Sequence, residues 1–382
     1  MRYRELGKTG LKVSEIGFGG EWMERRSEEE VKAVVECCEK NGINILDCWM
    51  SNPEVRTNLG KAIAGKREKW IIQGHFGSTW QNGQYVRTRE MDKVIPAFED
   101  LLERLGTDYI DLGMIHYVDS EEEFQKIMNG EFFEYVKEQK EKGVIRHIGL
   151  STHNPKIGKL AVLSGKIEML LFSINPAFDL LSTNILDEYY ESDYKNYNES
   201  FGRIHSDRVE LYQLCEKNGV GITVMKGFGG GRLFSAEASP LGIALTPLQC
   251  IHYALTRPAV ASIMIGYDFP KHVEEAVSYE TASEEEKDYA SVLAKAPHHP
   301  YSGQCTYCGH CAPCPAGIDI AMVNKFLDLA KMQEEIPASV KAHYEALGAT
   351  AKDCIACGGC EKRCPFGVSV IKRMEEAKEL FK

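Results

Sequence analysis

The chain has 382 residues, of which 43% are hydrophobic, 26% charged and 9% aromatic, and its formal net charge is −11. This composition excludes a chain that is disordered, collagenous or coiled-coil as a whole. The acidic balance disfavours nucleic acid and anionic lipid as partners, because both carry negative charge. No window approaches 18 uninterrupted apolar residues and the first ten residues hold no apolar signal segment, so we expect a cytoplasmic protein with no membrane contact.

The first 295 residues predict strands that alternate with helices. Ser27 and Glu30 form a capping box before an apolar helical face, residues 94–105 keep helical spacing, and a further helix begins after Thr246. Short apolar runs predict buried strands near 16–19, 43–47, 70–72, 110–115, 147–150, 169–172, 221–224 and 262–265. Eight strands over about 280 residues are typical of a (β/α)8 TIM barrel, and a doubly wound sheet is the alternative.

Polar side chains stand where several of these strands end. They are Asp47, His75, His116, Ser151 and Asn175. Any one of them alone could be a cap or a loop hydrogen bond. Because the carboxyl ends of barrel strands meet at one mouth, the five together predict a shared site.

Eight of the 13 cysteines fall into two regularly spaced runs. The runs are Cys305, Cys308, Cys311 and Cys314 before Pro315, and Cys354, Cys357, Cys360 and Cys364 before Pro365. Three closely spaced thiolates hold one face of an iron–sulfur cubane, and the fourth reaches the other cluster in two-cluster ferredoxins. The pattern predicts two 4Fe-4S clusters, held by Cys305, Cys308, Cys311 and Cys364, and by Cys354, Cys357, Cys360 and Cys314. Zinc ribbons are the alternative, but they use two separated pairs of ligands.

The residues between the two runs predict helices over 318–330 and 340–347. This link is longer than that of compact β-type ferredoxins. Residues 296–382 therefore resemble an α-helical dicluster ferredoxin, and Pro297 and Pro300 mark the linker before it.

Motifs along residues 1–295 resemble the aldo-keto reductases. The matching segments are Tyr3–Ser14, Gly106–Leu112, Gly143–Ser151, Met225–Leu233 and Val273–Glu275. The whole chain resembles the bacterial branch whose barrel carries a C-terminal dicluster ferredoxin module. The resemblance implies a nicotinamide-dependent oxidoreductase that acts on a small carbonyl or hydroxyl substrate at the barrel mouth.

The resemblance also implies an altered catalytic tetrad. The family uses Asp, Tyr, Lys and His, and here Asp47 and His116 match the first and last. The proton-donating Tyr falls on Asn52 and the Lys falls on His75. An amide cannot donate a catalytic proton, so we expect His75 or His116 to do the acid–base work. Cys48 is expected to be a buried structural thiol.

The nucleotide site that the resemblance implies is altered as well. Its residues are Ser151, Asn175, Gly229, Gly230, Asp268 and Glu275. Asp268 stands where the family commonly has a basic residue for the 2′-phosphate of NADPH. A carboxylate there would repel that phosphate and could bind a ribose hydroxyl, which favours NADH over NADPH.

Two features leave alternatives open. Residues 181–208, rich in tyrosine and acidic residues, predict either a lid over the mouth or a solvated loop. Hydride moves two electrons and a cluster moves one, so we expect an external ferredoxin or flavoprotein as electron partner. The alternatives to the redox enzyme are an electron-transfer protein with a non-hydride barrel, and a non-redox lyase or isomerase with structural clusters.

Overall fold

The computed structural model describes residues 1–180, 204–296, 303–332 and 335–382. Most of the predicted lid, residues 181–203, and the predicted linker at Pro297 and Pro300 lie outside these ranges. Helix α8 begins at Ser206, so the last residues of the expected insertion are helical. Within the described ranges, no helix has the length and apolarity needed to cross a membrane.

Eight parallel strands close into a barrel, which confirms the predicted fold and rules out the doubly wound sheet. They are β3 (Ile16–Gly19), β4 (Ile45–Cys48), β5 (Ile71–Phe76), β8 (Ile110–Ile115), β9 (Ile145–Thr152), β10 (Met169–Ser173), β11 (Gly221–Met225) and β12 (Val260–Gly266). Pairing of β12 with β3, in the register Ile263 with Ile16, closes the ring. The strands are mostly apolar on both faces because helices cover the outside and side chains fill the inside.

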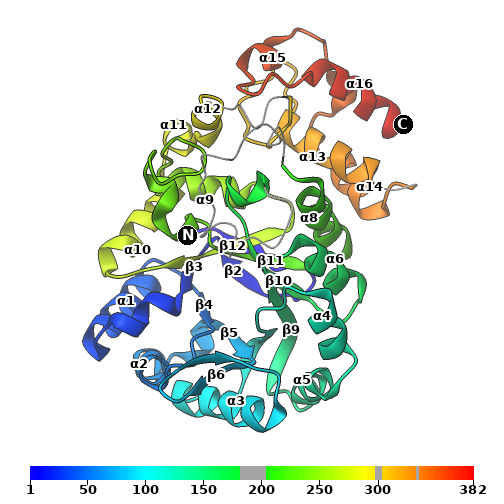
Figure 1. Cartoon of the computed structure of the whole chain (residues 1–382). Helices are drawn as coiled ribbons and strands as arrows, with labels where there is room; N and C mark the ends of the chain where they lie inside the picture. The colour runs from blue at the N-terminus through cyan, green and yellow to red at the C-terminus, as the bar shows by residue number, and fades with distance from the viewer. Residues whose placement is uncertain (181–203, 297–302, 333–334) are drawn as a thin grey trace.

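Helices surround the barrel and bury their apolar faces against it (Figure 1). They are α1 (Glu28–Lys40), α2 (Pro53–Ile63), α3 (Met91–Leu105), α4 (Glu121–Met128), α5 (Glu131–Glu141), α6 (Pro155–Leu163), α8 (Ser206–Asn218), α9 (Pro247–Leu255), α10 (Pro270–Val277) and α12 (Tyr289–Leu293). The short helix α11 (Glu284–Lys287) precedes α12 and is entirely charged. The capping box predicted at Ser27 and Glu30 is formed, and Thr246, where a further helix was predicted to begin, forms another with Gln249.

Two hairpins add to the barrel. The first, β1 (Tyr3–Glu5) and β2 (Lys12–Ser14), closes its N-terminal end, where Leu6 and Val13 are fully buried in the interior cluster. The second, β6 (Ser78–Gln81) and β7 (Gln84–Arg87), is inserted between β5 and α3 and is absent from the sequence prediction. It brings Tyr85 to the C-terminal mouth, next to His116.

The C-terminal region is helical, as predicted, and packs beside α8, α9 and α12 (Figure 1). Its helices are α13 (Ile320–Lys331), α14 (Ala338–Glu345), α15 (Gly359–Arg363) and α16 (Val370–Leu380). Lys325 on α13 pairs with Glu216 on α8 at 3.7 Å. Arg257 follows α9 and is 2% exposed, and its Nη2 donates to the carbonyl of Thr306 at 2.5 Å. These contacts hold the cysteine-rich region against the barrel wall.

The close packing of α2 on α3 gives a stability prediction. An added Cβ at Gly60 would lie 2.0 Å from the carbonyl oxygen of Arg104, which belongs to backbone and cannot swing away. We expect Gly60→Ala to lower the free energy of unfolding by about 1–3 kcal/mol, through overpacking. The matched control is Gly348→Ala, because an added Cβ there meets nothing within 4 Å. Urea unfolding followed by tryptophan fluorescence compares the two, and equal midpoints would contradict the packing described here.

Candidate active site and cysteine pockets

Three of the predicted polar residues form a hydrogen-bonded chain at the mouth. Nε2 of His75 lies 2.9 Å from Oδ1 of Asp47, and Nδ1 of His75 lies 2.8 Å from Nδ1 of His116. Asp47 comes from β4, His75 from β5, and His116 follows β8, so neighbouring strand ends supply all three. Their exposed fractions are 5%, 2% and 7% respectively. Burial makes each of these hydrogen bonds matter, because an unpaired polar group would be costly here.

A fixed amide supports the carboxylate from inside the barrel. Nε2 of Gln73 donates to Oδ1 of Asp47 at 2.8 Å, and the hydroxyl of Thr223 donates to Oε1 of Gln73 at 2.8 Å. Gln73 and Thr223 are both fully buried. They hold the Asp47 carboxylate in one orientation, and the sequence analysis missed both.

The inserted β6–β7 hairpin adds a fourth residue to this hydrogen-bonded chain. The hydroxyl of Tyr85 lies 2.8 Å from Nε2 of His116. The Trp49 ring stacks on His116 at 5.7 Å and meets the Tyr85 ring edge-on at 5.3 Å. Neither Tyr85 nor Trp49 was among the predicted site residues.

Electrostatics keep the second histidine neutral. Burial, followed by electrostatic interactions with His75, Arg89 and Arg87, holds the pKa of His116 well below its usual value. The imidazole of His116 therefore remains uncharged near neutral pH. Burial also raises the pKa of the Cys48 thiol to about 12, so it stays protonated and is no candidate nucleophile.

The other predicted side chains at the mouth have structural partners. Asn52 caps α2, and its Oδ1 accepts the N–H of Glu54 at 2.9 Å. Asn175 is fully buried: its Oδ1 accepts the N–H groups of Ala177 and Phe178, and its Nδ2 donates to the carbonyl of Lys226. Ser151 accepts the N–H of Tyr117 at 2.7 Å, which leaves its own hydroxyl hydrogen to donate. Of these three, Ser151 retains a group for a ligand amide.

The expected nucleotide end of the mouth carries an ion pair. Nη2 of Arg26 lies 2.5 Å from Oδ1 of Asp268, and its guanidinium stacks on Phe269 at 4.2 Å. The Asp268 carboxylate is thus neutralised by an arginine 242 residues away in sequence, which weakens the argument that it would repel a phosphate. Glu275 pairs with Lys271 on the exposed side of α10.

The glycine loop after β11 has the backbone form that only glycine adopts easily. Gly229, Gly230 and Gly231 have φ of 56°, 66° and 84°. The N–H of Gly229 donates to the carbonyl of Lys226 and that of Gly231 to the carbonyl of Phe228, so part of the loop's donor capacity is used internally. An added Cβ at Gly231 meets nothing within 4 Å, so the loop borders open space.

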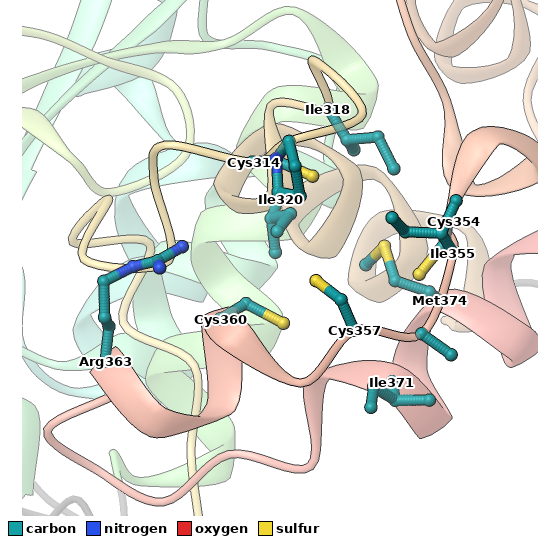
Figure 2. Close-up of a pocket in the computed structure, with 12 residues that line it drawn as sticks. Cys314, Ile318, Ile320, Cys354, Ile355, Cys357, Cys360, Arg363, Ile371 and Met374 are labelled. Atoms are coloured by element: carbon teal, nitrogen blue, oxygen red, sulfur yellow. The ribbon is translucent and has the colours of Figure 1, made fainter.

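The eight clustered cysteines line two pockets. The barrel-side cysteine pocket is lined by Cys305, Cys308, Cys311 and Cys364. The outer cysteine pocket is lined by Cys314, Cys354, Cys357 and Cys360 (Figure 2). Apolar residues such as Ile318, Ile320 and Met374 complete the outer pocket. Across the described ranges, no three His, Cys, Asp or Glu side chains converge as a single metal ion requires. Four thiols around an apolar pocket suit the larger iron–sulfur cubane.

Family models match both parts of the chain. Residues 15–244 match the aldo/keto reductase family, and residues 304–368 match a 4Fe-4S dicluster domain. The chain belongs to the aldo/keto reductase family. This aldo/keto reductase is therefore an oxidoreductase that carries a dicluster domain at its C-terminal end.

Individual relatives agree with this placement. An uncharacterized oxidoreductase of Bacillus subtilis, YqkF, is 27% identical over 274 residues, which are 70% of this chain and 87% of that protein. Aldo-keto reductase YhdN of the same organism is 30% identical over 40% of this chain and 47% of its own length. The holo form of aldo-keto reductase AKR11C1 from Bacillus halodurans superposes with a TM-score of 0.59 at 23% identity, over 78% of this chain and 99% of that one. The last likeness concerns the fold alone.

Proposed function

We propose that this chain is an iron–sulfur oxidoreductase that interconverts a small carbonyl compound and its alcohol at the barrel mouth. The observation that carries the proposal is the buried chain of Asp47, His75 and His116 at the strand ends. Negative charge develops on the substrate oxygen during such a reaction, and a buried imidazole chain can stabilise it or move a proton to it. Asn52 and His75 stand where the family has Tyr and Lys, so the proton must come from another side chain.

A nicotinamide nucleotide is the proposed hydride source. When bound, it would supply a hydride to the carbonyl carbon. Ser151 would hold its amide, the Gly229 to Gly231 loop its pyrophosphate, and Arg26 with Asp268 its adenosine ribose. These residues fit the nucleotide with one exception, since the amide of Asn175 is already engaged by backbone groups.

Two 4Fe-4S clusters are the proposed second redox component, one in each cysteine pocket. When bound, they would supply single-electron transfer. The side chains of Arg257 and Tyr289 both donate to the carbonyl of Thr306, which lines the barrel-side cysteine pocket, so this pocket touches the barrel directly. On the outer cysteine pocket, Cys357 and Ile355 are exposed, and Ile355 is 66% accessible. An exposed apolar residue beside the outer pocket supports an external ferredoxin or flavoprotein as partner. We propose a reducing cytoplasm as the location of the protein, because low-potential clusters of this kind suit a reducing compartment.

The test is an anaerobic titration of the holoprotein with NADH and then NADPH, followed by tryptophan fluorescence. Saturable binding of either nucleotide supports the proposal. Failure of both to bind would favour an electron-transfer protein with a non-hydride barrel. Turnover without any reductant, with the clusters kept oxidised, would favour a lyase or isomerase.

The Arg26 and Asp268 pair makes a prediction about nucleotide preference. Asp268→Asn frees the Arg26 charge for a 2′-phosphate, so we expect the affinity ratio of NADPH to NADH to rise about tenfold, which is about 1.4 kcal/mol. Arg26→Gln should lower the same ratio. The control is Glu134→Gln on α5, where the exposed carboxylate pairs with Lys137, and the fluorescence titration measures all of them. An unchanged ratio in both Asp268→Asn and Arg26→Gln would show that the pair does not face the nucleotide.

A further inference from the structure

Hydrogen bonds hold the β6–β7 hairpin to the segments that follow two barrel strands, β4 and β8. The hydroxyl of Ser78 donates to the carbonyl of Trp49 at 2.6 Å, and the hydroxyl of Ser51 donates to the carbonyl of Thr79 at 2.8 Å. These bonds tie the hairpin to the segment after β4. Arg87, which ends β7, donates to the carbonyl of Tyr117 at 2.7 Å and so ties the hairpin to the segment after β8. The position of Tyr85 is therefore fixed by the fold.

The Asp47 carboxylate fixes the direction of every hydrogen bond in the series that runs from Asp47 through His75 and His116 to Tyr85. The Asp47 carboxylate can only accept, so Nε2 of His75 carries a hydrogen and donates to it. In the neutral ring Nδ1 of His75 then accepts, so Nδ1 of His116 donates to it. Nε2 of His116 is left as an acceptor, and the hydroxyl of Tyr85 donates to it. Every contact is satisfied when all hydrogens point towards Asp47.

We propose that Tyr85 is the residue that exchanges a proton with the substrate oxygen, and that His116, His75 and Asp47 form a relay behind it. The inference rests on the proposed function. Tyr85 is half-buried: its ring packs edge-on against Trp49, and part of its surface remains accessible to solvent. It supplies the hydroxyl that Asn52 lacks, from a different point of the sequence.

The relay has a second satisfied arrangement, with one added proton. His75 is then an imidazolium that donates from Nε2 to Asp47 and from Nδ1 to His116. Nε2 of His116 carries a hydrogen and donates to the oxygen of Tyr85. The hydroxyl hydrogen of Tyr85 is released from His116 and points to the substrate. The added charge rests on His75 because that ring faces the Asp47 carboxylate, 2.9 Å away.

Reduction converts the second arrangement into the first. A bound, reduced nicotinamide would supply a hydride with its electron pair to the carbonyl carbon, so that the carbonyl would be reduced to an alcohol and the nicotinamide oxidised. The carbonyl oxygen bonds to the proton of Tyr85, whose own hydroxyl is re-formed with the proton from Nε2 of His116. Nδ1 of His116 takes the proton from Nδ1 of His75, which becomes neutral. Oxidation of the alcohol runs these transfers in reverse.

The experiment compares Tyr85→Phe, which removes only the hydroxyl, with Tyr3→Phe. Tyr3 lies in β1 at the opposite end of the barrel, where its hydroxyl donates to the carbonyl of Gly42. Turnover of benzaldehyde and propanal is measured on the anaerobic holoprotein with NADH and NADPH. We expect kcat to fall about 100- to 10,000-fold in Tyr85→Phe and to stay unchanged in Tyr3→Phe, with nucleotide affinity unchanged in both.

A second measurement is independent of turnover. Nitrogen-15 NMR of the histidine rings should show Nε2 of resting His116 as an unprotonated acceptor, and Tyr85→Phe should shift that signal. If the unaltered chain is active and Tyr85→Phe keeps its kcat, the inference fails and the proposed function stands. If the unaltered chain turns over neither aldehyde, the proposed function fails and takes the role of Tyr85 with it. A resting His116 protonated at Nε2 and indifferent to Tyr85→Phe would contradict the relay itself.

Discussion

Exchanging Cys364 for serine should abolish the cluster of the barrel-side cysteine pocket and leave the other cluster in place. Cys364 belongs to the second cysteine run in sequence, yet it lines one pocket with Cys305, Cys308 and Cys311 of the first. We expect the iron content to fall from about eight to about four per chain, since each cubane holds four irons. Iron analysis and EPR of the dithionite-reduced protein, purified without oxygen, measure the change.

The reciprocal exchange is the control for this prediction. Cys314→Ser should remove the cluster of the outer cysteine pocket, which Cys314 lines with Cys354, Cys357 and Cys360. Cys37→Ser, in α1, should keep both clusters. If Cys364→Ser abolishes the same EPR signal as Cys357→Ser, each cluster is held within one run and the proposed pairing is wrong.

Replacing Asp179 by alanine should lower the free energy of unfolding by about 3–5 kcal/mol, because it removes the counter-charge of the buried Arg208. Asp179 and Arg208 are both fully buried, and they lie 3.4 Å apart between the barrel and α8. The carboxylate also accepts the hydroxyl of Tyr253 at 2.6 Å and that of Tyr212. Without it, the Arg208 guanidinium keeps the carbonyl of Ser173, 2.9 Å away, but loses its counter-charge.

Urea unfolding of the holoprotein measures this loss. The control is Asp92→Ala. Asp92 is exposed, and within the described residues its one salt bridge is with the neighbouring Lys93. An exposed pair of that kind contributes about 0–1 kcal/mol. A cost for Asp179→Ala as small as that of Asp92→Ala would show that Arg208 finds another partner and that this network is not essential to the barrel wall.

The barrel could be predicted from sequence because each strand is a short apolar run followed by a turn or a helix signal. The β6–β7 hairpin was missed although its signal is present. Asn82-Gly83 is a favoured two-residue turn, and Thr79, Trp80, Tyr85 and Val86 around it are β-branched or aromatic. The hairpin is an addition to the alternating pattern of strands and helices, so that pattern alone does not predict it.

The candidate site was only partly predictable. Asp47 and His75 lie in the last residues of their strands and His116 directly follows its strand, so the topology alone brings them together. Tyr85 and Arg26 reach the mouth through loops whose course depends on tertiary contacts, and Arg26 meets Asp268 across 242 residues of sequence. The pairing of the cysteines stays a prediction that the two pockets support.

A deuterium-transfer experiment tests most directly whether hydride chemistry takes place at the barrel mouth. The protein is given benzaldehyde and NADH that carries deuterium at the hydride position of its nicotinamide. We expect the anaerobic holoprotein to form benzyl alcohol with deuterium on the carbinol carbon. We expect this reaction to be strongly slowed in Asp47→Asn, because the amide holds His75 less firmly than the carboxylate does. Unlabelled alcohol, formed only when the clusters are reduced by dithionite, or no alcohol at all, would contradict hydride chemistry at the barrel mouth.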